Sequence, residues 1–298
     1  MKIGIALPIT ENEAGIARYA EMRTMALQAE AAGFDSIWLY DHLVYRHTDT
    51  PTHGVWEAWT MLSALAEATS RVELGTLVVC TAFRNPALLA KMADAVDEVS
   101  QGRLILGLGA GWHKPEFDAF GLPFDHLASR FEEAMEIIHP LLRTGEVDFS
   151  GTYERAPNCV SQPRGPRPDG PPILIGASKP RMLRLTAQYA DAWNTCWLGQ
   201  PTKLAKRRAT MEAACRAVGR DPKTMEVTVG VSVVYDEPEA GADPIDPDKA
   251  LTGSAAEIAA GFRAYADLDV GHIICACSPN TSASLTRLTG ALDLYRGA

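Results

Sequence analysis

The sequence predicts a (β/α)8 barrel of the TIM type, built as a single domain. Along the 298 residues, eight short apolar segments alternate with amphipathic helical segments, which is the order of a β/α barrel. No linker or internal repeat divides residues 1–298, and a hydrophobic content of 47% is enough for one large core. A doubly wound open sheet is the alternative, although no reversal of strand order is visible in the sequence.

Each expected strand is a short run of apolar or β-branched residues. The strands are expected at 2–7, 36–40, 72–79, 104–108, 172–175, 192–195, 225–234 and 272–277. The helices follow them, with apolar residues recurring three and four apart. They are expected at 14–32, 54–69, 86–100, around 131–142, and at 180–189, 203–218, 254–268 and 282–295.

Two irregular segments interrupt this alternation. Residues 144–171 contain five prolines and are too long for an ordinary connection, so they predict an insertion after the fourth β/α unit. Residues 236–249 are acidic, broken by proline, and follow the seventh strand. In a barrel they lie on the catalytic face, where they form either a lid or an unstructured acidic loop.

Composition excludes several classes of protein. The net charge of −9 argues against a nucleic-acid partner or an anionic membrane surface. No apolar run reaches the roughly 20 residues that span a membrane, and the apolar start of the chain is too short for a signal peptide. The six cysteines form no CxxC pair, which is typical of reduced thiols. We therefore expect a soluble, cytoplasmic protein.

A glycine-rich turn stands out at the end of the fourth strand. Gly107, Gly109 and Gly111 alternate after an apolar run, so backbone can approach a large flat ligand there. A dinucleotide fingerprint would need glycine or alanine at the position of Trp112. The turn therefore predicts either a floor for a cofactor or substrate outside the Rossmann fold, or simply tight packing.

The mouth of a barrel collects the C-terminal ends of its strands, and the chemistry is expected there. The segments concerned are 7–8, 41–42, 76–84, 107–113, 176–178 and 193–195. They include Asp41 and His42 but no Ser-His-Asp set and no pair of catalytic carboxylates. His42, His47 and His53 lack carboxylates that would complete a metal site, so no metal is expected. Small and aromatic residues predict a bound organic cofactor that carries the reaction.

The fifth β/α unit suggests an anion site. Gly176, Ala177 and Ser178 form a turn of small residues that leads into a helix carrying Arg181 and Arg184 on one face. Free N–H groups, the helix dipole and the two guanidinium groups would together hold an anion such as a phosphate. The alternative is that this basic face is simply solvated.

Eight segments, in order along the chain, resemble the bacterial-luciferase-like superfamily of flavin and deazaflavin oxidoreductases, and within it the branch that uses coenzyme F420. These segments are 31–42, 56–60, 74–78, 84–91, 106–112, 120–124, 171–176 and 190–194. The resemblance extends over nearly the whole chain. It implies F420 as the cofactor, with FMN as the alternative because both cofactors bind the same mouth.

The resemblance also implies roles for individual residues. It places a non-proline cis peptide under the cofactor ring at Leu77–Val78, with Cys80 in the same cofactor-binding segment. Asp41 would contact the ring and His42 would shuttle a proton. The ring and ribityl chain would lie along Gly109, Ala110, Gly111 and Trp112. Cofactor phosphate would be held by Gly176, Ala177, Ser178 and Arg181.

One departure from the family pattern bears on the substrate. Sugar-phosphate dehydrogenases of this family carry a glutamate directly after the glycines of the fourth strand, where this chain has Trp112 followed by His113. Glu116 is a candidate replacement acid on the next helical turn. An apolar or aromatic substrate is therefore expected, facing Trp112 with Trp38, Trp56 or Phe83 nearby; core packing is the alternative role for these rings.

The resulting hypothesis is an oxidoreductase that transfers a hydride between F420 and a small organic substrate. The alternatives are an FMN-dependent monooxygenase that uses reduced flavin and O2 and is supplied by a separate flavin reductase, and a non-catalytic flavin-binding protein. The resemblance also implies a homodimer formed through the helices after the second and third strands, which carry apolar residues such as Trp59, Met61, Leu88 and Met92.

Overall fold

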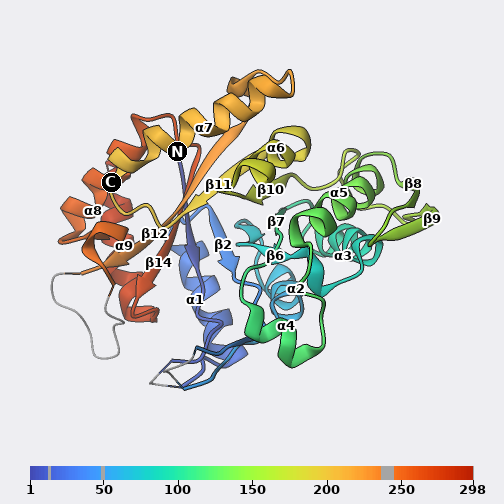
Figure 1. The fold of residues 1–298 in the computed structure, drawn as a ribbon. Coiled ribbons are helices and arrows are strands. Elements are labelled where there is room, and N and C mark those ends of the chain that lie inside the picture. The colour runs from blue at the N-terminus through green and yellow to red at the C-terminus, as the bar shows by residue number, and fades with distance from the viewer. Residues whose placement is uncertain (13–14, 48–50, 236–244, 298) are drawn as a thin grey trace.

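The computed structural model describes residues 1–12, 15–47, 51–235 and 245–297, which form the predicted closed barrel (Figure 1). Eight parallel strands pair in the order β1, β2, β5, β7, β10, β11, β12 and β14, and β14 pairs again with β1. All eight expected strands are present. They are β1 (Lys2–Ala6), β2 (Ser36–Leu39), β5 (Glu73–Thr76), β7 (Leu104–Gly109), β10 (Ile173–Gly176), β11 (Ala192–Cys196), β12 (Glu226–Val234) and β14 (His272–Ser278).

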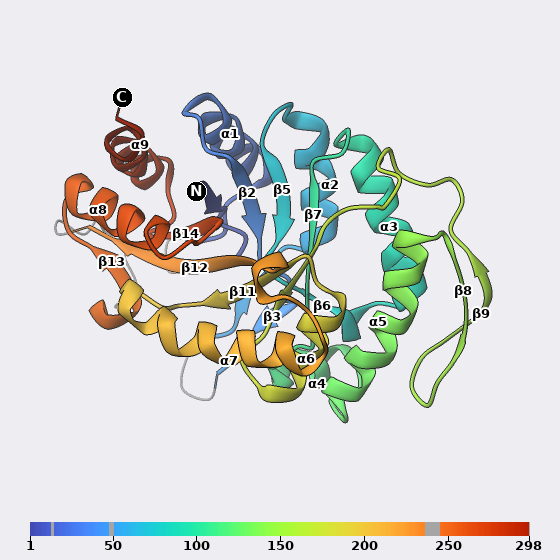
Figure 2. The same cartoon turned by 90° about the horizontal axis from the view of Figure 1, so that it is seen from above.

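Eight helices form a ring around the strands, as seen from above in Figure 2. They are α1 (Tyr19–Ala31), α2 (Ala58–Ala68), α3 (Pro86–Val99), α5 (Leu127–Arg143), α6 (Pro180–Tyr189), α7 (Leu204–Ala217), α8 (Ala255–Ala266) and α9 (Ser282–Arg296). Local signals start several of them. Asn85 accepts a hydrogen bond from the Leu88 N–H ahead of Pro86, and Ser254 and Glu257 form a capping box. Within the described residues, no helix has the length and apolar character needed to cross a membrane.

Several predicted boundaries differ from the structure. The second helix starts at Ala58 rather than at residue 54, because Glu57 caps it and Gly54 belongs to a short strand, β4 (His53–Gly54). The first helix starts at Tyr19 rather than near residue 14, because Gly15 has φ +108° and the extended Arg18 donates its N–H to Glu21 at the helix start. The third strand ends at Thr76 rather than at Val79, and the Leu77–Val78 peptide bond that follows it is cis. Val79 and Cys80 then form a separate short strand, β6, paired with β7.

The largest side chain inside the barrel is one tryptophan, which packs with smaller apolar residues such as Ile105, Leu174 and Ile274. Trp38 is fully buried, and its Nε1 donates to Ser36 Oγ at 2.7 Å, which in turn lies 2.7 Å from His272 Nε2. A Cβ on Gly75 would lie 2.2 Å from the Trp38 ring, and one on Gly4 would lie 2.1 Å from Ser36 Oγ. The two glycines therefore make the space that the tryptophan occupies, and the interior is packed below the mouth.

The predicted insertion contains a hairpin that was not predicted. Strands β8 (Glu146–Ser150) and β9 (Arg155–Val160) pair antiparallel, and β8 contacts α5. The segment then returns to the barrel, where Arg167 binds the buried carboxylate of Asp97 with Nη2–Oδ1 at 2.5 Å. In the acidic segment, residues 236–244 lie outside the described residues, so the lid hypothesis is untested there; residues 247–249 form a single 3-10 turn.

Candidate active site

A cavity of about 940 Å³ opens at the C-terminal ends of the strands, where the barrel predicts the chemistry. Its walls come from the ends of β2, β5, β7, β10 and β11 and from the first turns of α7. The lining residues are Tyr40, Asp41, His42, Tyr45, Leu77, Val78, Val79, Cys80, Gly111, Trp112, Glu116, Gly176, Ala177, Ser178, Lys179, Leu183, Trp193, Asn194, Thr195, Cys196, Trp197, Lys206, Arg207 and Thr210.

The glycines of the turn have two different roles, close packing and lining of the cavity. A Cβ on Gly107 would lie 1.8 Å from the Thr76 carbonyl oxygen, and one on Gly109 would lie 2.6 Å from Val78 Cγ2. These two glycines therefore let β7 lie against the Leu77–Val78 segment, which is the packing alternative. Gly111 has φ +84° and lines the cavity itself. The cis bond lies where the resemblance placed it.

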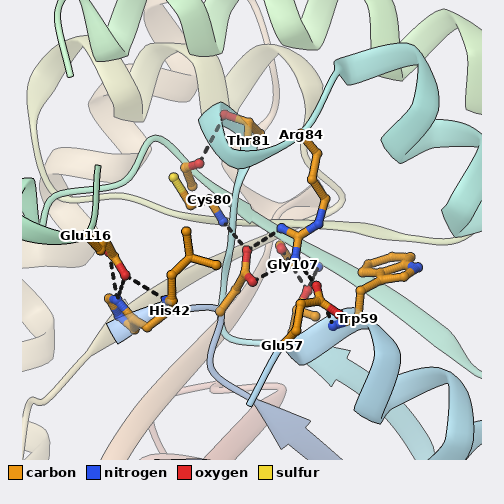
Figure 3. Close-up of polar contacts among 12 residues, drawn as sticks. His42, Glu57, Trp59, Cys80, Thr81, Arg84, Gly107 and Glu116 are labelled. Carbon is orange, nitrogen blue, oxygen red and sulfur yellow. Dashed lines mark hydrogen bonds and ion pairs between the residues drawn. The ribbon is translucent and has the colours of Figure 1, made fainter. Parts of the chain in front are cut away.

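His42 and Glu116 form a hydrogen-bonded pair on one wall of the cavity (Figure 3). His42 Nδ1 lies 2.9 Å from Glu116 Oε1, and the Leu43 N–H donates to Glu116 Oε2 at 2.8 Å. Only 1% of the Glu116 side chain is exposed. Since Nδ1 faces the carboxylate, Nε2 is the His42 nitrogen left for a ligand. Glu116 comes from α4 (Lys114–Phe120), a short helix that directly follows the glycine turn.

Aromatic rings surround this pair. The Tyr45 ring lies 4.3 Å from the His42 ring, centroid to centroid, and the Trp112 ring lies 5.7 Å from it. Burial and then the charge of Glu116 raise the pKa of Tyr45 well above its ordinary value, so Tyr45 is a neutral phenol at neutral pH. Trp112 is 62% exposed, which leaves a large apolar surface at the mouth.

Asp41 lies beside His42 but is bonded to protein groups through both oxygens. Arg84 donates to Asp41 Oδ2 at 2.7 Å and to Oδ1 at 3.0 Å, and the Cys80 N–H donates to Oδ2 at 3.0 Å. Arg84 also pairs with Glu57 at the start of α2 (Figure 3). Burial lowers the pKa of Arg84, but the carboxylates of Asp41 and Glu57 outweigh it and raise that pKa above its ordinary value. The network ties the loop after β2 to the Leu77–Cys80 segment.

The predicted anion site divides into two parts in the structure. Gly176, Ala177 and Ser178 line the cavity. Arg181 instead donates to Glu132 Oε2 at 2.5 Å and to Ser129 on α5, and Arg184 donates to Glu132 Oε1 at 2.6 Å. Hydrogen bonds from Arg181, opposed by partial burial, lower the pKa of Glu132.

Of the aromatic residues expected near the substrate, Trp112 lines the cavity and three others lie elsewhere. Trp38 fills the barrel, Trp56 donates its Nε1 to the Ala17 carbonyl at 2.9 Å, and Phe83 packs against Phe117 at 5.1 Å between ring centroids. The packing alternative holds for Trp38 and Phe83, whereas Trp56 is 39% exposed and belongs neither to the cavity lining nor to the core.

Several lining residues were not singled out from the sequence. They include Tyr40, Tyr45, Trp197, Lys206 and Arg207. Tyr40 directly precedes Asp41 at the end of β2, so its position in the predicted barrel already placed it at the mouth. Lys206 and Arg207 lie within a helix whose pattern resembles any solvated surface, so the sequence offered no comparable signal.

Comparison with known proteins identifies the family. Residues 1–244 match the luciferase-like monooxygenase family, which is most of the chain, so the chain belongs to that family. It is 32% identical over 247 residues, 77% of this chain and 66% of the relative, to a phthiodiolone/phenolphthiodiolone dimycocerosates ketoreductase of Mycobacterium kansasii. It is 30% identical over 241 residues, 74% of this chain and 64% of the relative, to pyrimidine monooxygenase RutA of Klebsiella pneumoniae.

The chain thus spans just under two thirds of the length of these two relatives. Its fold is similar to that of an F420-dependent secondary alcohol dehydrogenase solved with an F420–acetone adduct. The TM-score is 0.81 over 99% of both chains, at 20% identity.

Proposed function

We propose that this chain is an oxidoreductase that transfers a hydride between coenzyme F420 and a small apolar or aromatic substrate, with an alcohol and its ketone as the substrate class. The observation that carries the proposal is the His42–Glu116 pair, buried in the wall of a large cavity with one imidazole nitrogen left for a ligand. Hydride transfer to or from a carbonyl carbon needs a proton at the oxygen, and this pair can hold or supply it. A relative described as a ketoreductase supports the substrate class.

The lining residues fit a flat tricyclic cofactor. A Cβ on Gly111 would lie 2.6 Å from Cys80 Sγ, and one on Gly176 would lie 3.3 Å from Val78 Cγ1. Both glycines flank the Leu77–Cys80 segment, so backbone forms much of the wall on which a planar ring would rest. When bound, the deazaflavin ring would accept or donate the hydride.

The protein side of the reaction is then a matter of position and proton transfer. His42 would exchange a proton with the substrate oxygen through Nε2. Glu116 would hold the imidazole by Nδ1 and stabilise the imidazolium charge, as a carboxylate does in other histidine dyads. Trp112 and Tyr45 would cover the apolar part of the substrate and exclude water from the reacting carbon. Asp41 and Arg84 would act indirectly, by fixing the loop that carries His42.

The first test is a calorimetric titration of the purified protein with oxidised F420 and, separately, with FMN. Tight binding of F420 and reduction of F420 by a short secondary alcohol would support the proposal. Preference for FMN, with oxygen consumption on addition of reduced flavin, would refute it in favour of the monooxygenase. His42→Ala is expected to bind F420 normally and to lose turnover, so full activity in that variant would contradict the role of His42.

A further inference from the structure

We propose that Lys179, Lys206 and Arg207 form an anion-binding subsite on the wall of the cavity opposite His42, and that it holds the negatively charged tail of the cofactor. This inference rests on the proposed function. The ligand chemistry is a phosphate or a run of carboxylates joined to a flat ring. Arg181, which the sequence suggested for this task, lies outside the cavity lining and is bonded to Glu132.

The order of the strands around the barrel shows where the subsite lies relative to His42. Arg207 Nη1 donates to Thr195 Oγ1 at 2.6 Å and to the Cys196 carbonyl at 2.9 Å, so this side chain is fixed at the end of β11. In the closed ring of eight strands, β11 lies four places from β2, which precedes His42. Arg207 and His42 therefore face each other across the mouth. Lys179 follows β10, the neighbour of β11.

The charges of the cavity are separated in the same way. Its two carboxylates, Asp41 and Glu116, lie on the His42 side and are bonded to Arg84 and to His42. Among the residues that the structure describes, the opposite wall carries three cations and no carboxylate. Within the part of the chain that the structure describes, no Asp or Glu lies within 4.0 Å of the three cationic groups. In a chain of net charge −9, such a wall is selective for an anionic ligand.

Backbone groups add to the same wall. Residues 176–179 line the cavity and lead directly into α6, a helix of 10 residues that begins at Pro180. The first N–H groups of a helix have no intrahelical partner and favour an anion. Ser178 also offers a hydroxyl beside Lys179. With the ring against the Leu77–Val78 segment, a tail directed to this wall leaves the His42 side free for substrate.

The experiment compares ligands that share a ring but differ in their tail. The deazaflavin ring with its ribityl chain, the phospholactyl form, and F420 with its glutamate tail are titrated by calorimetry, in parallel with riboflavin and FMN. The proteins are the unaltered chain, Lys206→Ala, and the double variant Lys206→Ala/Arg207→Gln. The matched control is Arg216→Ala, which removes an exposed cation from the same helix.

The unaltered chain is expected to bind the phospholactyl form about tenfold to about a hundredfold more tightly than the bare ring compound, as charge-assisted hydrogen bonds allow. The double variant should lose that preference while binding the bare compound as before, which also shows that it is folded. Lys206→Ala should lose part of this preference for the phospholactyl form, and Arg216→Ala should keep all of it. The gain from the phospholactyl form to full F420 measures the contribution of the carboxylates.

Three results overturn the inference. They are equal affinity of the unaltered chain for tailed and tail-less compounds, an undiminished preference in the double variant, and loss of the preference in a further variant, Arg181→Ala, titrated in the same way. If only the flavins bind, the F420 proposal fails by itself. The difference between riboflavin and FMN then tests the subsite in the same variants.

Discussion

Replacing Glu116 with glutamine tests the site most directly. The substitution keeps the shape of the side chain but removes its charge, and it leaves one oxygen to serve both His42 Nδ1 and the Leu43 N–H. Because the carboxylate is almost fully buried, solvent does not screen its interaction with His42. A hydrogen bond to a charged group contributes about 1.5–3 kcal/mol.

If Glu116 makes this hydrogen bond to the imidazolium that forms during proton transfer, the free energy of the bond lowers the activation barrier and so contributes to kcat. At about 1.4 kcal/mol per factor of ten, Glu116→Gln should lower kcat by about tenfold to about 150-fold. Cofactor affinity should change little, since Glu116 touches His42 rather than the Leu77–Val78 segment. His42→Ala should cost more, about 100-fold to 10,000-fold, because it removes the proton carrier itself.

The assay follows F420 reduction at saturating secondary alcohol, after a panel of alcohols has identified one that turns over. Asp118→Asn is the matched control, since it neutralises an exposed carboxylate on the same helix, where the partner is Lys114. The double variant His42→Ala/Glu116→Gln should be no slower than His42→Ala alone if the two residues act as one unit. A Glu116→Gln enzyme with unchanged kcat, beside an inactive His42→Ala enzyme, would refute the pairing argument.

Four further predictions concern the scaffold. Arg84→Met leaves a buried carboxylate unpaired and should lower the free energy of unfolding by about 3–5 kcal/mol in urea; a loss below about 1 kcal/mol would contradict the network. Gly107→Ala should give little folded protein, because its Cβ meets the Thr76 carbonyl at 1.8 Å; a normal yield of cooperatively unfolding protein would contradict this. Burial, with smaller contributions from nearby positive charges, lowers the pKa of His272 from 6.5 to about 3. The free energy of unfolding should therefore be highest above about pH 6.5 and fall by about 1.4 kcal/mol per pH unit toward pH 3, because only the unfolded chain binds the proton in that range. A His272→Gln variant whose stability falls equally steeply would refute this. Leu88, 55% exposed on α3, should matter for a homodimer, and sedimentation of Leu88→Asp as the same species as the unaltered chain would count against that surface.

The fold followed from the sequence because each β/α unit carries its own local signals. An apolar run followed by an amphipathic helical segment repeats eight times, and no long-range information is needed to count these units. The hairpin at 146–160 gave no such signal. Its strands are largely exposed, and Pro157 interrupts the second one, so the segment resembles a proline-rich loop until its packing on α5 is known.

The candidate site was predictable where it depends on position in the barrel. Asp41, His42, the Leu77–Cys80 segment, Gly111 and Gly176–Ser178 all lie at strand ends and all line the cavity. Pairing between distant side chains was not predictable in the same way. The carboxylate of Glu132 binds Arg181 from 49 positions away, and Glu116 meets His42 from 74 positions away.

The tryptophan inside the barrel closes the interior below the cavity. Trp38 packs against Gly4 and Gly75 so closely that a Cβ at either glycine would clash with it, so the packed interior blocks a ligand from the opposite end of the barrel. A cofactor ring seated on the Leu77–Val78 segment must enter and leave by the same mouth as the substrate. Binding is therefore ordered: the ligand that lies deeper in the cavity binds first and is released last.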